Sequence, residues 1–158
     1  MLFALNKNKG WRAIFGNKGE DTRLRDVELI LRFFALLHDG KKYAKPMKTF
    51  LNNFMASQKS AKPELLAGSK STFEATVQAV HESLGERPFH LRAGLNAAAF
   101  DAVFVAFAQH KKAVPKDIAQ RFKILKQDGK FIEWVTSGTT DENAIRGRCD
   151  QAKNILFG

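Results

Sequence analysis

The residues best placed to do chemistry are charged side chains in segments that are otherwise apolar. Arg25, Glu28 and Arg32 recur at spacings of three and four residues, so on a helix they share one narrow face. Nine of the thirteen residues in 26–38 are apolar, which is too many for a single stripe of a surface helix. The segment is therefore predicted to be a buried central helix. Its charges must be paired, because an isolated buried charge is costly.

Asp101 lies in a second segment of this kind. Twelve of the fourteen residues in 95–108 are apolar, and the positions three and four residues from Asp101 carry no charge. Its partner must then come from another helix, and the candidates are Arg25, Arg32 and Arg148. We interpret six residues as a structural charge cluster that fixes helix register: Arg25, Asp26, Glu28, Arg32, Asp101 and Arg148. The alternative is a catalytic acid, but one carboxylate without a base makes no acid–base pair, so no catalytic residue is assigned.

Lysines form two groups that could bind phosphates. The chain has 26 Lys and Arg against 16 Asp and Glu, and a net charge of +10 favours polyanions, DNA first. One group spans a turn, and the other lies opposite the apolar stripe of a helix predicted over 115–128. The candidate nucleic-acid-binding residues are Lys41, Lys42, Lys45, Lys112, Lys116, Lys123 and Lys126. Lysines so spaced can follow a phosphate backbone without reading bases, although a solvated surface explains them equally well.

Thr139 and Thr140 open a predicted terminal helix that ends near residue 156. The sequence from Thr139 to Glu142 has the pattern of a capping box, in which hydroxyl and carboxylate satisfy free amides at a helix start. Such amides also favour an anion such as phosphate. An ordinary helix cap is the alternative interpretation.

Motifs of known enzymes are absent from the sequence. It has no glycine-rich phosphate loop, dinucleotide fingerprint, nucleophile elbow or zinc-protease helix, and its four histidines lie in no metal-ligand spacing. We therefore predict no metal, no cofactor and no enzymatic activity. The single Cys149 predicts a reducing compartment, and the cytoplasm is expected because no signal peptide is recognisable. The most apolar segment is shorter than the roughly 20 residues that span a bilayer, so no membrane association is expected.

Start and stop signals predict an all-α fold, a single compact domain over 1–158 with about six helices. Short helical pieces are expected at 2–8 and 11–15, followed by the central helix, capped by Asp21 or Thr22 and ending near 38. Further helices are predicted at 46–57, 71–84, 91–110, 115–128 and from 139 onward. A capping box from Ser71 to Glu74 marks the start of the helix predicted at 71–84, and 57–68 is predicted to be a connector. Residues 131–135 are ambiguous between helix and strand.

Several ordered motifs resemble the helical C-terminal region of GmrSD-like proteins. They are Trp11-Arg12-Ala-Ile-Phe-Gly16, Arg23-x-Arg25-Asp26-x-Glu28-Leu-Ile-Leu-Arg32-Phe, Tyr43-x-x-Pro46-Met-Lys-x-Phe50-Leu51-Asn52, Asn96-x-Ala-x-Phe100-Asp101-Ala-Val, and Gly138-Thr139-Thr140-Asp141 with Arg148 downstream. The resemblance implies a modification-dependent restriction or phage-defence system. Family members carry an N-terminal ParB/sulfiredoxin-like domain with an Asp-Gly-Gln-Gln-Arg motif linked to nucleotide hydrolysis, and some add an HNH nuclease domain. Neither part is present in this sequence, so the resemblance implies only a role for the helical portion.

Two functions follow from these observations. The first is a non-enzymatic module that associates with DNA through the lysines named above. The second is a docking module for the N-terminal ParB/sulfiredoxin-like domain, a partner protein or a second copy of the chain. It would use an apolar N-terminus formed by Leu2, Phe3, Leu5 and Trp11. That apolar start also suggests a fragment or split-gene form of a longer protein.

Overall fold

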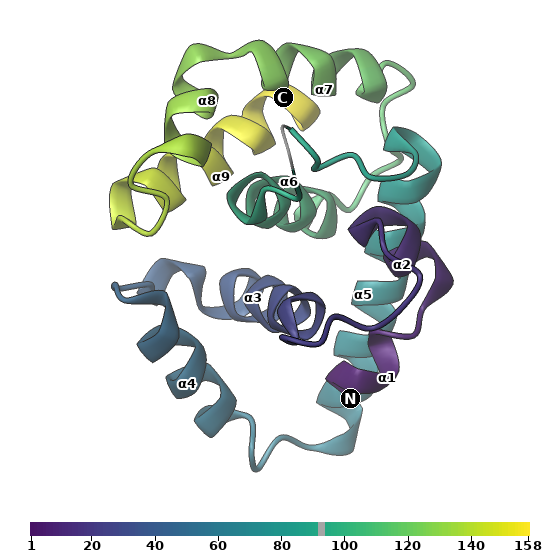
Figure 1. Ribbon diagram of the computed structural model, residues 1–158, viewed down its shortest axis with the longest axis vertical. Coiled ribbons are helices and arrows are strands. Elements are labelled where there is room, and N and C mark those ends of the chain that lie inside the picture. Colours follow the sequence, from purple (N-terminus) through teal and green to yellow (C-terminus); the bar gives the residue numbers. More distant parts are fainter. Residues whose placement is uncertain (92–93) are drawn as a thin grey trace.

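The computed structural model describes residues 1–91 and 94–158, and in this part of the chain it contains nine α-helices and no strand (Figure 1). The helices are α1 (Leu2–Leu5), α2 (Lys9–Phe15), α3 (Arg25–Asp39), α4 (Met47–Ser57), α5 (Pro63–Leu84), α6 (Ala97–Gln109), α7 (Ile118–Gln127), α8 (Gly129–Thr136) and α9 (Glu142–Phe157). A short 3-10 helix, η1 (Gly40–Lys42), follows α3. The all-α prediction is confirmed. The count of about six was too low, because several of the helices are only one or two turns long.

Helix α6 is the centre of the fold. Eleven of its thirteen residues are buried, which is expected of a helix that is apolar on every side. Helices α3, α5, α8 and α9 pack against it, and Figure 1 shows α6 end-on between α9 and α3. Asn96 begins the helix, since its side-chain oxygen accepts a hydrogen bond from the Ala99 amide at 2.8 Å.

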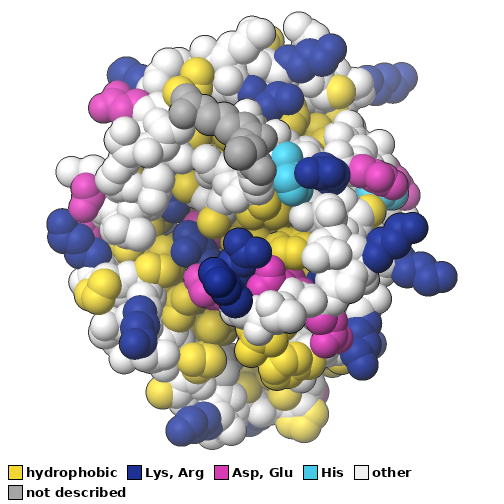
Figure 2. All heavy atoms as spheres, viewed as in Figure 1, with side chains coloured by type: hydrophobic (Ala, Val, Ile, Leu, Met, Phe, Trp, Pro, Cys, Tyr) yellow, Lys and Arg dark blue, Asp and Glu magenta, His cyan; other side chains and the backbone are white. Residues whose placement is uncertain are grey.

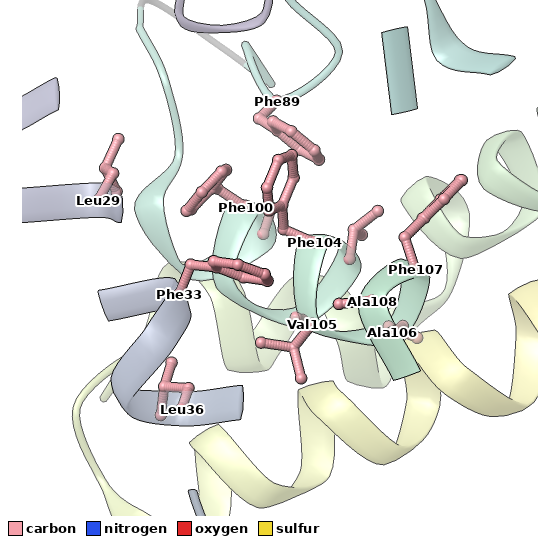
Figure 3. Packing of buried hydrophobic residues seen from close by; sticks show 14 of the residues in the cluster. Leu29, Phe33, Leu36, Phe89, Phe100, Phe104, Val105, Ala106, Phe107 and Ala108 are labelled. Carbon is pink, nitrogen blue, oxygen red and sulfur yellow. The ribbon is translucent and has the colours of Figure 1, made fainter. Parts of the chain in front are cut away.

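Aromatic rings fill the space around α6. The ring centroids of Phe100 and Phe104 are 4.7 Å apart, and Phe33 of α3 meets Phe104 edge-on at 5.1 Å (Figure 3). Phe89 approaches Phe100 edge-on from the segment that follows α5. These T-shaped and tilted arrangements are the ones that the ring quadrupole favours. One cluster of buried hydrophobic residues includes members from all nine α-helices.

Two predicted helix starts were wrong. The capping box from Ser71 to Glu74 lies inside α5, and Thr72 donates from Oγ1 to the Gly68 carbonyl one turn earlier at 2.9 Å. Helix α5 begins instead at Pro63, whose fixed φ suits a first helical position. The predicted connector therefore ends before Pro63. Helix α6 begins at Ala97 rather than 91, and residues 92–93 of that predicted helix lie outside the described residues.

The other boundaries fall close to their predicted places. Residues 131–135, ambiguous from sequence, form part of α8, whose start is capped by Asp128 through a 2.8 Å bond from the Phe131 amide. Helix α9 begins at Glu142, with Asp141 at its cap position and no side-chain capping bond, so the capping box at Thr139 was wrong. None of the helices in the described chain combines the length and the apolar character needed to cross a bilayer.

Candidate functional site

Asp101 is held by two arginines from different helices. Its carboxylate is fully buried on α6 and accepts from Arg32 Nε at 3.2 Å and from Arg32 Nη2 at 2.5 Å. Arg148 Nη2 of α9 lies 3.3 Å from the same carboxylate, and Arg148 Nη1 donates to the Thr139 carbonyl at 2.6 Å. The structure thus brings together three of the predicted charges. It joins α3, α6 and α9 through one carboxylate.

Arg25 and Glu28 do not enter this network. Arg25 is the first residue of α3, about 10 Å along the axis from Arg32, and it is mostly exposed. Its guanidinium binds Asp21 at 2.8 Å. Glu28 is half exposed and lies 3.8 Å from Arg32, so it contributes little. The single cluster expected from the sequence is therefore divided.

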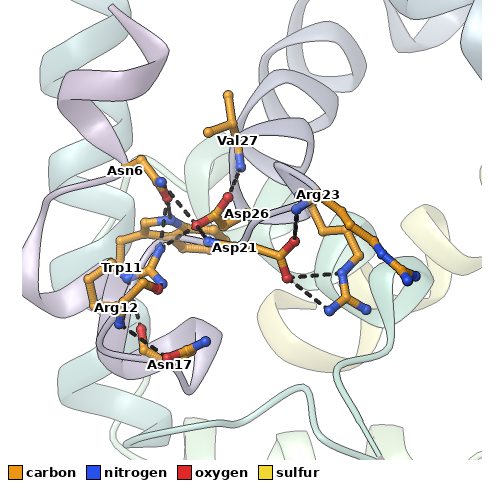
Figure 4. Close-up of polar contacts among 10 residues, drawn as sticks. Asn6, Trp11, Arg12, Asn17, Asp21, Arg23, Asp26 and Val27 are labelled. Atoms are coloured by element: carbon orange, nitrogen blue, oxygen red, sulfur yellow. Dashed lines mark hydrogen bonds and ion pairs between the residues drawn. The ribbon is translucent and has the colours of Figure 1, made fainter.

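Asp26 is the centre of a second buried network (Figure 4). One of its oxygens accepts from Asn6 Nδ2 at 3.0 Å, from Arg12 Nη1 at 2.7 Å and from the Asp21 amide at 2.9 Å. The other accepts from the Val27 amide at 2.8 Å. This carboxylate ties the first two helices and the loop before α3 to the start of α3.

Hydrogen bonds set the ionisation of these carboxyl groups. Burial by itself would raise the pKa of Asp26, but the bonds from Asp21, Asn6, Arg12 and Val27 together hold the pKa below its ordinary value. The bond from Arg25 lowers the pKa of Asp21. Both groups are therefore carboxylates at neutral pH.

Two members of this network, Asn6 and Arg12, were not predicted from the sequence. Asn6 is 1 % exposed, and its side-chain oxygen also accepts from Trp11 Nε1 at 2.9 Å. The sequence offered two signals. Asn6 is a polar residue directly after the apolar residues 2–5, and Arg12 directly follows Trp11. Asn6 directly follows α1 and Arg12 lies in α2, and each of these short helices resembles a surface segment when seen alone.

Thr139 and Thr140 contribute backbone oxygens rather than an anion site. The Thr139 carbonyl binds Arg148, and the Thr140 carbonyl accepts from the Tyr43 hydroxyl at 2.7 Å. Two carboxylates, Asp141 and Glu142, stand at this helix start. They would repel an added phosphate, so the geometry favours an ordinary helix start here.

The predicted lysines lie in two separate places. Lys41, Lys42 and Lys45 are exposed around η1, far from α7 in Figure 1. Lys42 Nζ lies 2.7 Å from Asp39, and Lys45 Nζ lies 3.0 Å from Asp141. Two members of this group are therefore already paired with carboxylates of the protein.

The lysines of α7 and the loop before it are exposed and unpaired. Lys112, Lys116, Lys123 and Lys126 lie within 4.0 Å of no carboxylate in residues 1–91 and 94–158. We call these four residues the α7 lysine face. Lysine and arginine side chains gather over α7 at the top of Figure 2.

Helix α7 is fixed to the core on its other side. Ile118, Phe122 and Leu125 are buried, and Arg121 binds Asp117 at 2.9 Å and donates to the Gly158 carbonyl at 3.0 Å. The arginine of this helix therefore serves the fold. Its lysines are exposed, and the ammonium of Lys126 lies 4.8 Å from the centre of the Phe122 ring.

The apolar N-terminus does not form the docking surface expected from the sequence. Leu5 is 2 % exposed and Trp11 is fully buried, where its ring lies 5.4 Å from that of Phe100. Met1 and Phe3 remain exposed. Leu5 and Trp11 belong to the core because Asn6 and Asp26 anchor the first two helices to α3.

The titratable groups outside these two networks include one free thiol, that of Cys149. In the described part of the chain, no three His, Cys, Asp or Glu side chains are grouped so that they could hold a metal ion. Burial raises the pKa of the Cys149 thiol to about 12, so this thiol is protonated and poorly nucleophilic at neutral pH. Comparisons with protein-family models, curated proteins and solved structures find no match to this chain.

Proposed function

We propose that this chain is a non-enzymatic helical module that associates with DNA through the α7 lysine face. The observation that supports this function is the contrast between the two lysine groups. Two of the three around η1, Lys42 and Lys45, are paired with carboxylates, whereas the four of the α7 lysine face are exposed and have no carboxylate within 4.0 Å in the described chain. Leaving like charges together without counterions destabilises a fold slightly, so a face of this kind suits an anionic partner.

The phosphate backbone is the part of DNA that such a face would contact. Lys123 and Lys126 are three residues apart on α7, so their side chains lie on neighbouring parts of one helix surface. A lysine ammonium is a flexible point charge, which suits phosphate oxygens and carries no sequence information. The proposed binding is therefore electrostatic and independent of sequence.

The resemblance to GmrSD-like proteins is the reason for choosing DNA among polyanions. In such a system the helical module would hold DNA while an N-terminal ParB/sulfiredoxin-like domain supplies the chemistry. This division of labour is part of the proposal. It requires no catalytic residue in the present chain.

Charge reversal on matched surfaces tests the proposal. Fluorescence anisotropy with a labelled duplex of about 20 base pairs is expected to show binding by the wild type at low salt. Binding should be lost in K116E/K123E/K126E and largely kept in K41E/K42E/K45E, which changes the net charge by the same amount on the other group. Equal loss in both variants would show a net-charge effect only, and absence of wild-type binding would overturn the proposal.

Partner docking is the second candidate, on a surface different from the one expected. Met1, directly before α1, and Phe3 of α1 are exposed, and Leu65 near the start of α5 is 63 % exposed. Helices α1 and α5 pack together, so these apolar side chains belong to neighbouring elements. If DNA does not bind, self-association measured by light scattering, and its loss in F3E/L65E, would favour docking.

A further inference from the structure

A cleft of about 820 Å³ opens between α3, α6 and α9. It is bordered by the C-terminal end of α3, η1, the second half of α6 and the side of α9. Its volume is in the range of pockets that enclose small organic ligands. The cleft borders none of the four residues of the α7 lysine face.

The wall contributed by α9 presents alternating apolar and charged positions. The apolar residues are Ile145 and Cys149. Each is followed in the chain by a charged residue, Arg146 or Asp150, and Lys153 lies three residues further along the helix. These residues recur at spacings of three and four, so they share one side of the helix. Helix α9 packs its other sides on α6, α7 and α8, which leaves this side facing the cleft.

Apolar side chains line the interior of the cleft. Leu36 and Leu37 come from α3, and Val105 and Ala106 come from α6. Together with Ile145 they provide a hydrophobic surface from three helices. An apolar ligand body placed here would be removed from water on several sides.

The charges around the cleft do not cancel. Lys42 is paired with Asp39 at 2.7 Å, so these two charges offset each other. The Glu142 carboxylate accepts from the backbone amide of Lys45 at 2.9 Å, and this neutral donor leaves its negative charge in place. Lys41, Arg146, Lys153 and Asp150 also border the cleft. No ion pair within 4.0 Å involves any of these last four residues in the described chain. The unpaired groups are therefore three cations against the carboxylates of Glu142 and Asp150, an excess of one positive charge.

We infer that this cleft binds a small organic anion with an apolar body, its acidic group held by Lys41, Arg146 and Lys153. The apolar body lies against Leu36, Val105 and Ile145. Binding is non-covalent, because the neighbouring Cys149 thiol is protonated. This activity is separate from DNA association, since the two sites use different residues.

A fluorescent anion provides the test. Anilinonaphthalene sulfonate combines an apolar ring system with one negative charge, and phenylnaphthylamine is its neutral counterpart. The folded wild-type chain is expected to bind the sulfonate with one-to-one stoichiometry and to bind the neutral dye at least about tenfold more weakly. In the wild type, amide shifts in an NMR titration should be largest at Ala106 and Ile145.

Variants assign the site. R146E/K153E is expected to weaken sulfonate binding by about tenfold or more, whereas R146K/K153R, which keeps both charges, should bind as the wild type. K123E/K126E makes the same charge change on the α7 lysine face. This variant should lose affinity for DNA and should bind the sulfonate dye as tightly as the wild type. Circular dichroism of each variant verifies folding. Unchanged sulfonate affinity in R146E/K153E, equal binding of the neutral dye, or shifts located elsewhere would each overturn the inference.

Discussion

The fully buried carboxylates of Asp26 and Asp101 each have an arginine partner, and their two networks join different parts of the fold. Asp101 binds both Arg32 and Arg148, so it links α6 to α3 on one side and to α9 on the other. Asp26 collects donors from the N-terminal segment and from the start of its own helix. Both fix the relative positions of elements that apolar packing alone would leave free to slide.

Asp101→Asn tests the first network. The amide keeps the shape of the side chain but removes the charge, so Arg148 is left fully buried without a carboxylate. Breaking a buried pair in this way typically costs about 3–5 kcal/mol. Urea denaturation should show a loss of that order in the free energy of unfolding. Glu28→Gln is the control, with a loss below about 1 kcal/mol expected because Glu28 is half exposed. Similar losses in the two variants would contradict a stabilising role for Asp101.

Asp26→Asn tests the second network through pH. The pKa of Asp26 is lowered in the folded protein, so the folded state releases this proton more readily than the unfolded state. The stabilisation is therefore fully present above the unfolded value, near 3.8, and is lost as pH falls through the lower folded value. Urea unfolding across this window should show a steeper loss of stability for wild type than for Asp26→Asn. Identical pH dependence would contradict the assigned role.

At the scale of residues, the sequence predicted the partners of Asp101 better than those of Asp26. Asp101 was recognisable because a lone carboxylate in an apolar segment demands a partner, and two of its three candidate partners do bind it. Arg25 is also an arginine, but it lies two helical turns from Arg32 and forms an ion pair with Asp21 instead. The donors from Asn6 and Arg12 could not be anticipated, because their contact with Asp26 depends on how the first two helices fold back onto α3.

At the scale of elements, close packing of α8 on α9 depends on a glycine. A Cβ added at Gly147 would lie 2.7 Å from Cε2 and Cζ2 of Trp134. Gly147→Ala is therefore expected to destabilise the protein by about 1–3 kcal/mol, because the ring must move. Gly68→Ala is the matched control, since Gly68 lies within α5 with nothing within 4 Å of the added carbon. That change should stabilise by about 0.5–1 kcal/mol. Thermal unfolding compares the two, and a Gly147→Ala variant as stable as Gly68→Ala would contradict the packing.

Helix identities were predictable where composition was strong, and boundaries were not. The apolar character of α6 and the two-sided pattern of α7 identified both as helices. The capping pattern at Ser71 was misleading, because serine and glutamate at that spacing also occur inside a helix, where no free amide needs them. Pro63, which fixes φ at a helix start, was the better signal.

At the scale of the whole molecule, a net charge of +10 says less than its distribution. Lys45 and Asp141 form an ion pair although they are 96 residues apart in the chain. No local pattern could reveal that this lysine is engaged and that those of α7 are not. The fold therefore turns two similar lysine groups into different surfaces. One is tied to the protein, and the other is presented on a helix that the core holds in place.

The dependence of DNA affinity on salt tests the central claim most directly. Each lysine–phosphate contact should contribute about −0.9 to the slope of log affinity against log salt concentration, so the four lysines of the α7 lysine face should give a slope near −4. Replacing Lys116, Lys123 or Lys126 with glutamine is expected to flatten the slope by about one for each lysine removed. Glutamine at Lys42 or Lys45 should leave it unchanged. A slope near zero, or equal flattening by both groups, would contradict the proposed interface.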